Sequence, residues 1–475
     1  MQRLSGMDAS FLYMETPTHH MHVCGTLLLD PSTMKDGYSF DRFKELIRAR
    51  LHLMPMLRRR VLMVPLNIDH PVWIEDPDFN LDRHIHRLTV HPPGTPHELA
   101  DVVGDIASRP LDRSLPLWEM NVVEGLEDGA VALVTKMHHA CIDGITGADM
   151  MSHLLDLEPD TPSVPPPADE WVPDAVPSDV ALCADALVSR AKDPLRTVRA
   201  LSRTGRSLIE MGRQVIGIGT DQRLRPALPF TGPRTLFNAP ITANRVVAFG
   251  QARLDDLKLI KNTFATTVND VVLAASAMTL RRYLLHHDDL PDRPLIAAVP
   301  VSVHGKTEHG GTNQVSNMFV RLPVDTDDPV EQLLRIHEET KDAKAVHNAM
   351  GADLIQDMAL IAPPGIYNLA LRLYALPQVS ATLPPVQNVV ISNVPGPPIP
   401  LYIAGARVKG IYPFGPLIEG SGVNITVLSN MGNMDFGVIA CGDTVPDVWQ
   451  IADGFSAAVL ELRAAAKSQT APTER

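Results

Sequence analysis

Two histidines, an aspartate and a glycine at fixed spacing could carry acid–base chemistry in this chain. They lie in the segment His138-His139-Ala140-Cys141-Ile142-Asp143-Gly144, which has the pattern HHxxxDG. An imidazole has an unperturbed pKa of about 6.5, so a histidine that faces a substrate hydroxyl is a suitable general base near neutral pH. The segment follows an apolar run typical of a strand and precedes a helical pattern, a junction where side chains can protrude from a rigid scaffold. It is the candidate catalytic centre, although an adjacent histidine pair can also be purely structural.

The alternation of side chains along a strand predicts different roles for the two histidines. Successive strand residues point to opposite faces, so His138 and His139 should not do the same job. Asp143 is placed to hold the loop through an ion pair or through backbone N–H groups. Gly144 permits a tight entry into the helix that follows.

Two other interpretations of this segment are weaker. A metal site is disfavoured because ligands at positions 138, 139 and 143 do not share one face, and no Cys or Glu set completes them. Cys141 as a nucleophile would need its own base and an electropositive environment. We therefore predict general-base chemistry and no metal.

A second group of histidines comprises His19, His20, His22, His84 and His86. An HxH run on a strand puts both rings on one face, so a pair of metal ligands is geometrically possible. Histidines on half-exposed strands and loops explain the group more simply. We expect no metal here either.

Composition and charge exclude several classes of protein. The 475 residues carry 42 lysines and arginines against 55 aspartates and glutamates, a formal charge of −13, which disfavours nucleic acid as the main partner. Hydrophobic residues make up 45% of the chain, ample for a packed core. The four cysteines are far apart, which predicts no disulfide framework and fits a reducing compartment.

Membrane-spanning and secreted proteins are also disfavoured. The N-terminus has no basic segment followed by an apolar one, so we expect no secretion signal. The longest uncharged stretch, 373–406, holds seven prolines and cannot form one spanning helix. The sequence therefore predicts a soluble or peripheral protein.

The helices and strands that must position the HHxxxDG segment fall into two halves of the chain, and each half contains both kinds of element. Residues 158–179 hold seven prolines and six acidic residues, a composition typical of a linker between them. For the first half we predict helices that begin at residue 40, capped by Ser39, and that span 96–107 and 143–157. The predicted strands of this half are 72–75, 84–90, 118–126 and 130–139, of which the last two pair with each other. For the rest we predict helices at 180–215, 268–285 and 445–466 and strands at 295–303, 317–324, 388–392, 423–429 and 434–440.

The predicted organisation is an α/β (α+β) chain in four parts. A first domain, 1–157, carries the HHxxxDG segment, and a proline-rich and helical crossover follows at 158–240. A second domain spans 241–467, and the polar tail 468–475 is expected to be disordered.

The HHxxxDG pattern resembles the active-site motif of the CoA-dependent acyltransferase superfamily that includes chloramphenicol acetyltransferase and the condensation domains of peptide synthetases. Within it, the chain resembles the bacterial wax ester synthase/diacylglycerol acyltransferase family, and the resemblance covers nearly the whole chain. The other matching motifs are LSGMDASFLYMETPTHHMH (4–22), PLW (116–118), ND (269–270), PVS (300–302), GTNQ (311–314), SNVPGP (392–397), YPFGP (412–416) and MDFG (434–437).

The resemblance implies a fold, a reaction and roles for particular residues. The fold would be two chloramphenicol-acetyltransferase-like domains, and the reaction transfer of a long-chain acyl group from acyl-CoA to diacylglycerol. His139 would be the general base and His138 a secondary residue, while Asp143 would orient the loop. Asn269 would contact the oxyanion or the substrate, with Gly144 and Asp270 in the binding site.

The same resemblance sets the expected cofactors, partners and location. Acyl-CoA would be a co-substrate, with no cofactor and no metal. A cytoplasmic enzyme with such apolar acceptors would lie at the inner membrane or at lipid inclusions. Three alternatives stay open: a wax ester synthase that uses long-chain alcohols, a non-catalytic lipid-binding relative, and a transferase that acts on a carrier-bound thioester.

Overall fold

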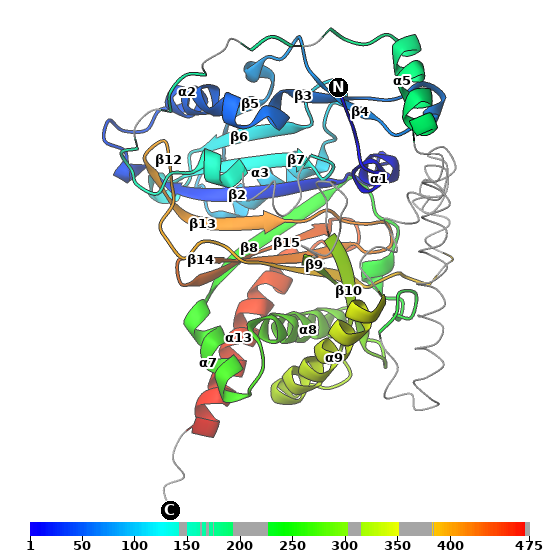
Figure 1. Ribbon diagram of the computed structural model, residues 1–475. Helices are drawn as coiled ribbons and strands as arrows, with labels where there is room; N and C mark the ends of the chain where they lie inside the picture. The colour runs from blue at the N-terminus through cyan, green and yellow to red at the C-terminus, as the bar shows by residue number, and fades with distance from the viewer. Residues whose placement is uncertain are drawn as a thin grey trace, which may run out of the picture.

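Two six-stranded mixed sheets, each accompanied by helices, dominate the part of the chain that the structure describes (Figure 1). This α/β architecture confirms the predicted fold class. The computed structural model describes residues 1–141, 150–161, 164–167, 171–173, 175–192, 227–302, 315–350, 382 and 384–470.

The first sheet carries the candidate catalytic strand near its centre. Its strands follow the order β12-β13-β2-β7-β6-β5, and all neighbours pair antiparallel except β5 and β6. Strands β12 and β13 come from late in the chain yet lie beside β2, so this sheet crosses the predicted domain boundary (Figure 1). The strands are β2 (His22–Asp30), β5 (Ile85–Thr89), β6 (Trp118–Glu124), β7 (Val131–His138), β12 (Tyr402–Ile403) and β13 (Ala406–Phe414).

The second sheet is built from the second half of the chain. Its order is β10-β9-β11-β14-β15-β8, and β11 runs parallel to both β9 and β14. Loops at the carboxyl ends of β11 and β14 therefore leave the sheet at the same edge. The strands are β8 (Arg245–Arg253), β9 (Leu295–Ser302), β10 (Val315–Leu322), β11 (Val389–Val394), β14 (Val423–Asn430) and β15 (Asn433–Cys441).

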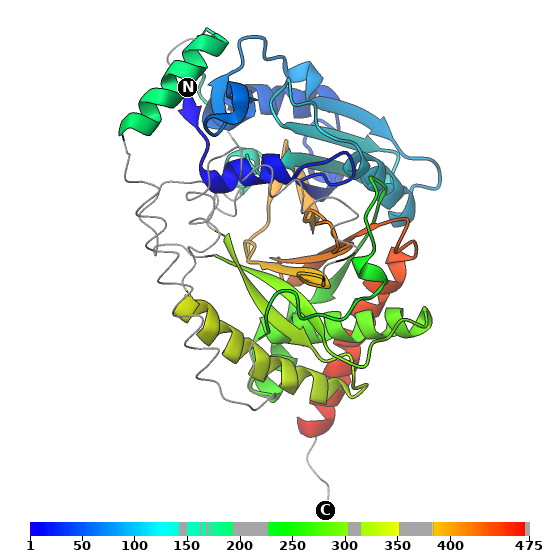
Figure 2. The same ribbon diagram turned by 90° about the vertical axis from the view of Figure 1, so that its right-hand side faces the viewer.

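Helices cover one face of the second sheet and bridge the two sheets. The long helices α8 and α13 pack on the second sheet and on each other (Figures 1 and 2). Helix α3 packs between the sheets, where Gly104 lets it approach β8 so closely that a Cβ atom would lie 2.7 Å from the Arg245 carbonyl oxygen. The helices are α1 (Gly6–Met14), α2 (Phe40–Arg50), α3 (Pro96–Ser108), α5 (Asp179–Lys192), α7 (Leu254–Thr263), α8 (Val268–His286), α9 (Pro329–Met350) and α13 (Val448–Thr470).

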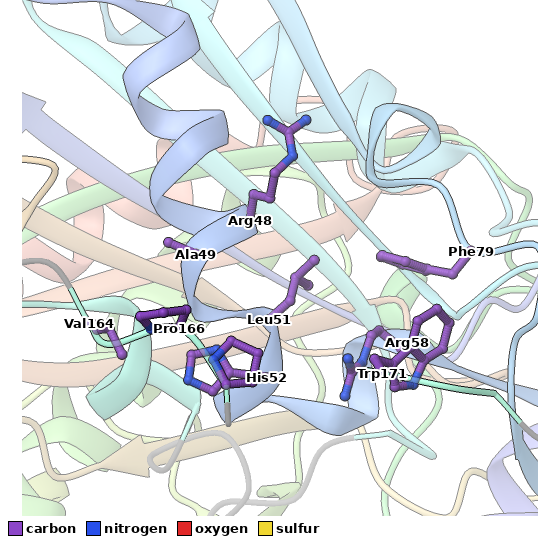
Figure 3. Close-up of a pocket in the computed structure, with 10 residues that line it drawn as sticks. Arg48, Ala49, Leu51, His52, Arg58, Phe79, Val164, Pro166 and Trp171 are labelled. Atoms are coloured by element: carbon purple, nitrogen blue, oxygen red, sulfur yellow. The ribbon is translucent and has the colours of Figure 1, made fainter. Parts of the chain in front are cut away.

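The described part of the proline-rich crossover packs against the first half. The Trp171 indole N–H donates to Glu75 at 2.9 Å, and the Arg58 guanidinium lies 4.8 Å from the Trp171 ring centroid. A cavity of about 310 Å³ remains between this segment and α2 (Figure 3). His52 and Phe79 also line it, but none of the candidate site residues does.

The element boundaries differ from the sequence predictions in instructive places. The strand at 72–75 is β4 (Val72–Glu75), which pairs with β1 (Gln2–Arg3) and β3 (Arg59–Leu62) in a small third sheet. The closing helix α13 runs to Thr470, so the first three residues of the predicted disordered tail are helical, and 471–475 lie outside the described residues. The predicted helix at 143–157 is described only from residue 150, and the stretch 193–215 is not described.

Candidate active site

Strand β7 delivers the two histidines to the end of the first sheet. Its residues 131–134 and 136–138 are buried, because β2 and β6 flank the strand and packed layers cover both of its faces. The strand ends at His138, and His139 begins the turn that follows. Asp143 and Gly144, predicted to shape the next loop, lie outside the described residues.

His138 is locked inside the protein. It is 1% exposed, and its Nδ1 accepts a hydrogen bond from the Ala140 backbone N–H at 3.0 Å. Burial lowers the pKa of His138 to about 3, because the charged ring would lose its hydration. The ring is therefore neutral, with its proton on Nε2, and it fixes the turn that carries His139.

Glu15, the residue that caps the C-terminal end of α1, holds the other side of this histidine. Its Oε1 lies 3.8 Å from His138 Nε2 and 3.4 Å from His22 Nε2, and its Oε2 accepts from Arg113 Nε at 2.8 Å. Burial raises the pKa of Glu15, but the His22 hydrogen bond and the charge and hydrogen bond of Arg113 act in the opposite direction, and the pKa is lowered to about 2. Arg113 also donates to the Leu12 carbonyl at 2.8 Å, which joins α1 to the network.

His139 lies in a different environment. It is only half-buried, and its backbone N–H donates to the Met21 carbonyl at 2.7 Å. Its ring stacks on Phe11 of α1, with centroids 4.2 Å apart and an interplanar angle of 26°. One face of the imidazole is therefore fixed by an aromatic ring while part of the side chain reaches solvent. This arrangement suits a base that must meet a substrate hydroxyl.

Four of the five histidines in the second group are buried, so the prediction of half-exposed side chains is wrong for them, whereas His86 is half-buried as expected. His19, His20 and His22 are each at most 5% exposed, and His84 is also buried. Burial lowers the pKa of His19 and of His20 to about 4. Among the described residues, no group of three or more His, Cys, Asp or Glu side chains is arranged to hold a metal ion.

The remaining residues around β7 have structural roles. Cys141 is 4% exposed and burial raises its thiol pKa, which disfavours a nucleophile there. Trp118 is a buried anchor, as expected, since its indole N–H donates to the Leu57 carbonyl at 2.7 Å and its ring stacks on His84. Lys136 is fully buried and donates to the Ile106 and Arg109 carbonyls at the end of α3.

Asn269 and Asp270, the ND pair, lie in the first turn of helix α8. They differ in burial, as His138 and His139 do. Asp270 is buried and caps α8 together with Thr267; it also accepts from Thr340 Oγ1 and from His337 Nδ1, each at 2.7 Å. These bonds occupy the carboxylate and favour a positioning role over substrate contact. Asn269 is half-buried, and its Oδ1 accepts from Asn393 of the SNVPGP segment at 3.4 Å.

The carboxyl ends of β11 and β14 connect this region to the first half. The Gly396 N–H, two residues after β11, donates to Ser429 Oγ at 2.9 Å, and Gly396 lies against the Leu428 side chain. Leu428 in turn packs on the core cluster of the first half that contains Ala140 and Cys141. Ligand sites form at such strand ends in α/β sheets.

Sequence reasoning found the histidines and missed what holds them. Glu15, Phe11 and Arg113 were assigned no role, although Glu15 lies four residues before a run of three histidines, a spacing that could have suggested a partner. Arg113 gives no such signal, because only the fold brings it to Glu15.

Comparisons with known proteins agree with this architecture. A family model described as the wax ester synthase/diacylglycerol acyltransferase catalytic domain matches residues 4–272, and the C-terminal domain of the same family matches 311–463. A putative diacylglycerol O-acyltransferase of Mycobacterium tuberculosis H37Rv is 40% identical over 97% of this chain and 90% of that protein. A probable diacylglycerol O-acyltransferase of the same strain is 34% identical over 96% and 98%.

Solved structures give the same result. The wax ester synthase/diacylglycerol acyltransferase from Marinobacter aquaeolei VT8 has a TM-score of 0.70 and 27% identity, covering 98% of this chain and all of that one. The starter condensation domain of rhizomide synthetase, at 12% identity and a TM-score of 0.53, shares the fold. This chain belongs to the wax ester synthase/diacylglycerol acyltransferase family.

Proposed function

We propose that the chain transfers a long-chain acyl group from acyl-CoA to the free hydroxyl of diacylglycerol, giving triacylglycerol and CoA, with His139 as the general base. The observation that carries this proposal is the contrast at the end of β7. His138 is neutral, buried and bonded, whereas His139 is half-exposed on a stacked and positioned ring. Relatives that cover nearly the whole chain bear the names of diacylglycerol O-acyltransferases.

The chemistry needs little beyond a base and an oxyanion donor. His139 takes the proton from the acceptor hydroxyl, and the oxygen attacks the thioester carbonyl. The tetrahedral intermediate collapses as the carbon–sulfur bond breaks, and the imidazolium returns the proton to the CoA thiolate. A thioester is already activated, so neither a covalent enzyme intermediate nor a metal is required, and the needs are orientation and oxyanion stabilisation. We assign that stabilisation to the Asn269 amide.

A second candidate is transfer to a long-chain alcohol, which gives a wax ester. The names of the family and of the Marinobacter relative include both activities. The same base and oxyanion donor serve either acceptor. The choice between them depends on the shape of the acceptor site.

We also propose that the protein works at the surface of a membrane or a lipid inclusion. Among the described helices, none is long and apolar enough to cross a bilayer. Diacylglycerol partitions into lipid, so the enzyme must meet it there. Peripheral contact satisfies both conditions.

The test is acyl transfer by purified protein. Labelled palmitoyl-CoA is incubated with diacylglycerol, hexadecanol or no acceptor, and the lipids are separated. We expect labelled triacylglycerol from wild type and a loss of about 10²–10⁴-fold in His139→Ala, the range for removal of a general base. Labelled wax ester without triacylglycerol would support the second candidate, and no transfer to either acceptor would refute both.

A further inference from the structure

Asn269 and Asn393 meet where the start of helix α8 approaches the end of strand β11. The Asn393 amide Nδ2 donates to Asn269 Oδ1 at 3.4 Å. Both side chains are half-buried, and among the described residues neither side chain forms another hydrogen bond. Asn269 belongs to the ND pair and Asn393 to the SNVPGP segment, so the contact joins two motifs that are 124 residues apart in the sequence.

The direction of the Asn269 amide matters for the role assigned to it. A side-chain amide has one oxygen that accepts hydrogen bonds and, on the other side, a nitrogen that carries two N–H donors. Because Oδ1 of Asn269 faces Asn393, its Nδ2 turns away and has no hydrogen-bond partner among the described residues. An oxyanion needs N–H donors, and an amide turned the other way would present its oxygen to the developing negative charge.

The main chain of Asn269 is fixed by the cap of α8. Thr267 Oγ1 accepts from the Asp270 N–H at 3.2 Å, and the Asp270 carboxylate accepts from the Thr267 N–H at 2.9 Å. The same carboxylate accepts from His337 and Thr340 of α9, each at 2.7 Å. This cap does not set the last torsion of the Asn269 side chain, which is soft in asparagine, so the amide direction needs a separate constraint.

Asn393 is itself held firmly, as such a constraint requires. It pairs in register with Val427 of β14 in a parallel ladder, and Ile391, two residues earlier, is buried in the core. Beyond the strand, the Gly396 N–H donates to Ser429 Oγ at 2.9 Å, and a Cβ atom on Gly396 would clash with the Ser429 carbonyl oxygen. The chain is therefore fixed on both sides of Asn393, and its amide is a rigid donor for a neighbouring side chain.

We propose that Asn393 is a positioning residue for acyl transfer, whose amide holds the Asn269 side chain with its N–H donors directed at the oxyanion. This inference rests on the proposed function, because it concerns the residue to which we assign oxyanion stabilisation. Asn393 acts through Asn269 and need not touch the substrate. Helix α8 packs on the sheet that contains β11 (Figure 1), so the pair is built within one half of the chain.

The experiment begins with kcat, KM and Tm of variants at position 393, with palmitoyl-CoA and dissolved 1,2-dihexanoylglycerol. Asn393→Ala removes the donor, and kcat should fall about 3–10-fold, as expected for one orienting hydrogen bond. Asn393→Asp places an acceptor opposite Asn269 Oδ1 and turns that amide around, so kcat should fall about 10²-fold, as in Asn269→Ala. KM for palmitoyl-CoA and Tm should stay near wild type. The matched control is Val394→Ala, the next residue of β11 on the opposite strand face, which should keep the wild-type kcat.

A double-mutant cycle gives the decisive readout. In an Asn269→Ala background, neither Asn393 substitution should cause a further loss, because the amide on which Asn393 acts is gone. Full additive losses in that background would overturn the inference, since Asn393 would then act independently of Asn269. A kcat of Asn393→Asp equal to or above that of Asn393→Ala would also overturn it. With an active wild type and a slow Asn269→Ala, either result leaves the proposed function standing, whereas no transfer by wild type would refute the function and this role together.

Discussion

The end of β7 and the start of α8 each carry a pair of neighbouring polar residues, and the two pairs are built alike. In each pair one residue is buried and hydrogen-bonded, His138 through Nδ1 to Ala140, and Asp270 to Thr267, Thr340 and His337. The other residue, His139 or Asn269, is left half-buried. The comparison indicates that the buried member fixes the backbone, while the half-buried member keeps partial exposure to solvent.

The two pairs differ in the charge state of their buried residue. His138 is kept neutral beside the ionised Glu15, whereas Asp270 is ionised and hydrogen-bonded, so that its pKa is lowered although burial alone would raise it. The first pair belongs to a network of histidines and the second to a helix cap. Acid should therefore affect the first region before the second.

In the α8 pair, the largest loss of activity is expected when Asn269 is replaced. This substitution tests whether the half-buried member of the pair takes part in the reaction. If its amide stabilises the oxyanion, Asn269→Ala should lower kcat by roughly 10²–10³-fold with little change in Tm. The matched variant, Asp270→Asn, should lower Tm, because it weakens bonds to His337 and Thr340. Steady-state kinetics and thermal unfolding of both variants check this. A wild-type kcat in folded Asn269→Ala would remove Asn269 from the reaction.

Lowering the pH should destabilise the region of the buried histidines before it affects the start of α8. The folded pKa values of His138, His19 and His20 are about 3, 4 and 4, below the unfolded value of about 6.5. Below pH 6.5 the unfolded chain binds protons that the folded chain does not, so stability present above pH 6.5 is lost as the pH falls toward 4. Each buried histidine contributes roughly 1 kcal/mol per pH unit.

The measurement is the free energy of unfolding of wild type and His138→Gln between pH 8 and pH 4. Wild type should lose stability through this range, and His138→Gln should lose it less steeply, because one titrating group is gone. Identical slopes for the two proteins would contradict the neutral, buried state assigned to His138. Glu15, with a folded pKa of about 2, adds its own loss only below its unfolded value of about 4.5.

A smaller effect is expected at Phe11, which positions His139 through ring stacking. Phe11→Leu keeps an apolar side chain but removes the stack, worth about 0.5–1.5 kcal/mol. We expect kcat to fall several-fold with KM for acyl-CoA unchanged, and Phe11→Tyr to restore it. A change in KM alone would show that Phe11 shapes a binding surface and does not orient the base.

Several elements followed from local patterns, and others, among them β2, β8, α1, α7, α9 and β13, were not predicted. The strand at Val72–Glu75, the helix at Val268–His286 and strand β7 were predicted nearly to the residue, because each has a clear period of 2 or 3.6. Strand β13 was not predicted, since Gly410 and Pro413 interrupt its pattern and its partner β2 lies near the other end of the chain.

Some features of the candidate site followed from local sequence patterns, and others depend on tertiary packing. The type and spacing of residues predicted His139 and Asn269, which the described structure places at the end of a strand and the start of a helix. The burial of His19, His20 and His22 and the role of Glu15 could not be predicted, because they depend on the packing of α1 against the first sheet. Asp143 and Gly144 remain predictions.

The central claim is that His139 is the base and His138 its fixed support. The most direct measurement is kcat and Tm of His139→Gln and His138→Gln with palmitoyl-CoA and dissolved 1,2-dihexanoylglycerol. The structure predicts that His139→Gln loses at least about 10²-fold in kcat and melts like wild type. It predicts that His138→Gln melts lower, because the Ala140 N–H and Glu15 lose their partner, and keeps a larger share of its activity. The reverse result, a folded and inactive His138→Gln beside an active His139→Gln, would contradict this assignment.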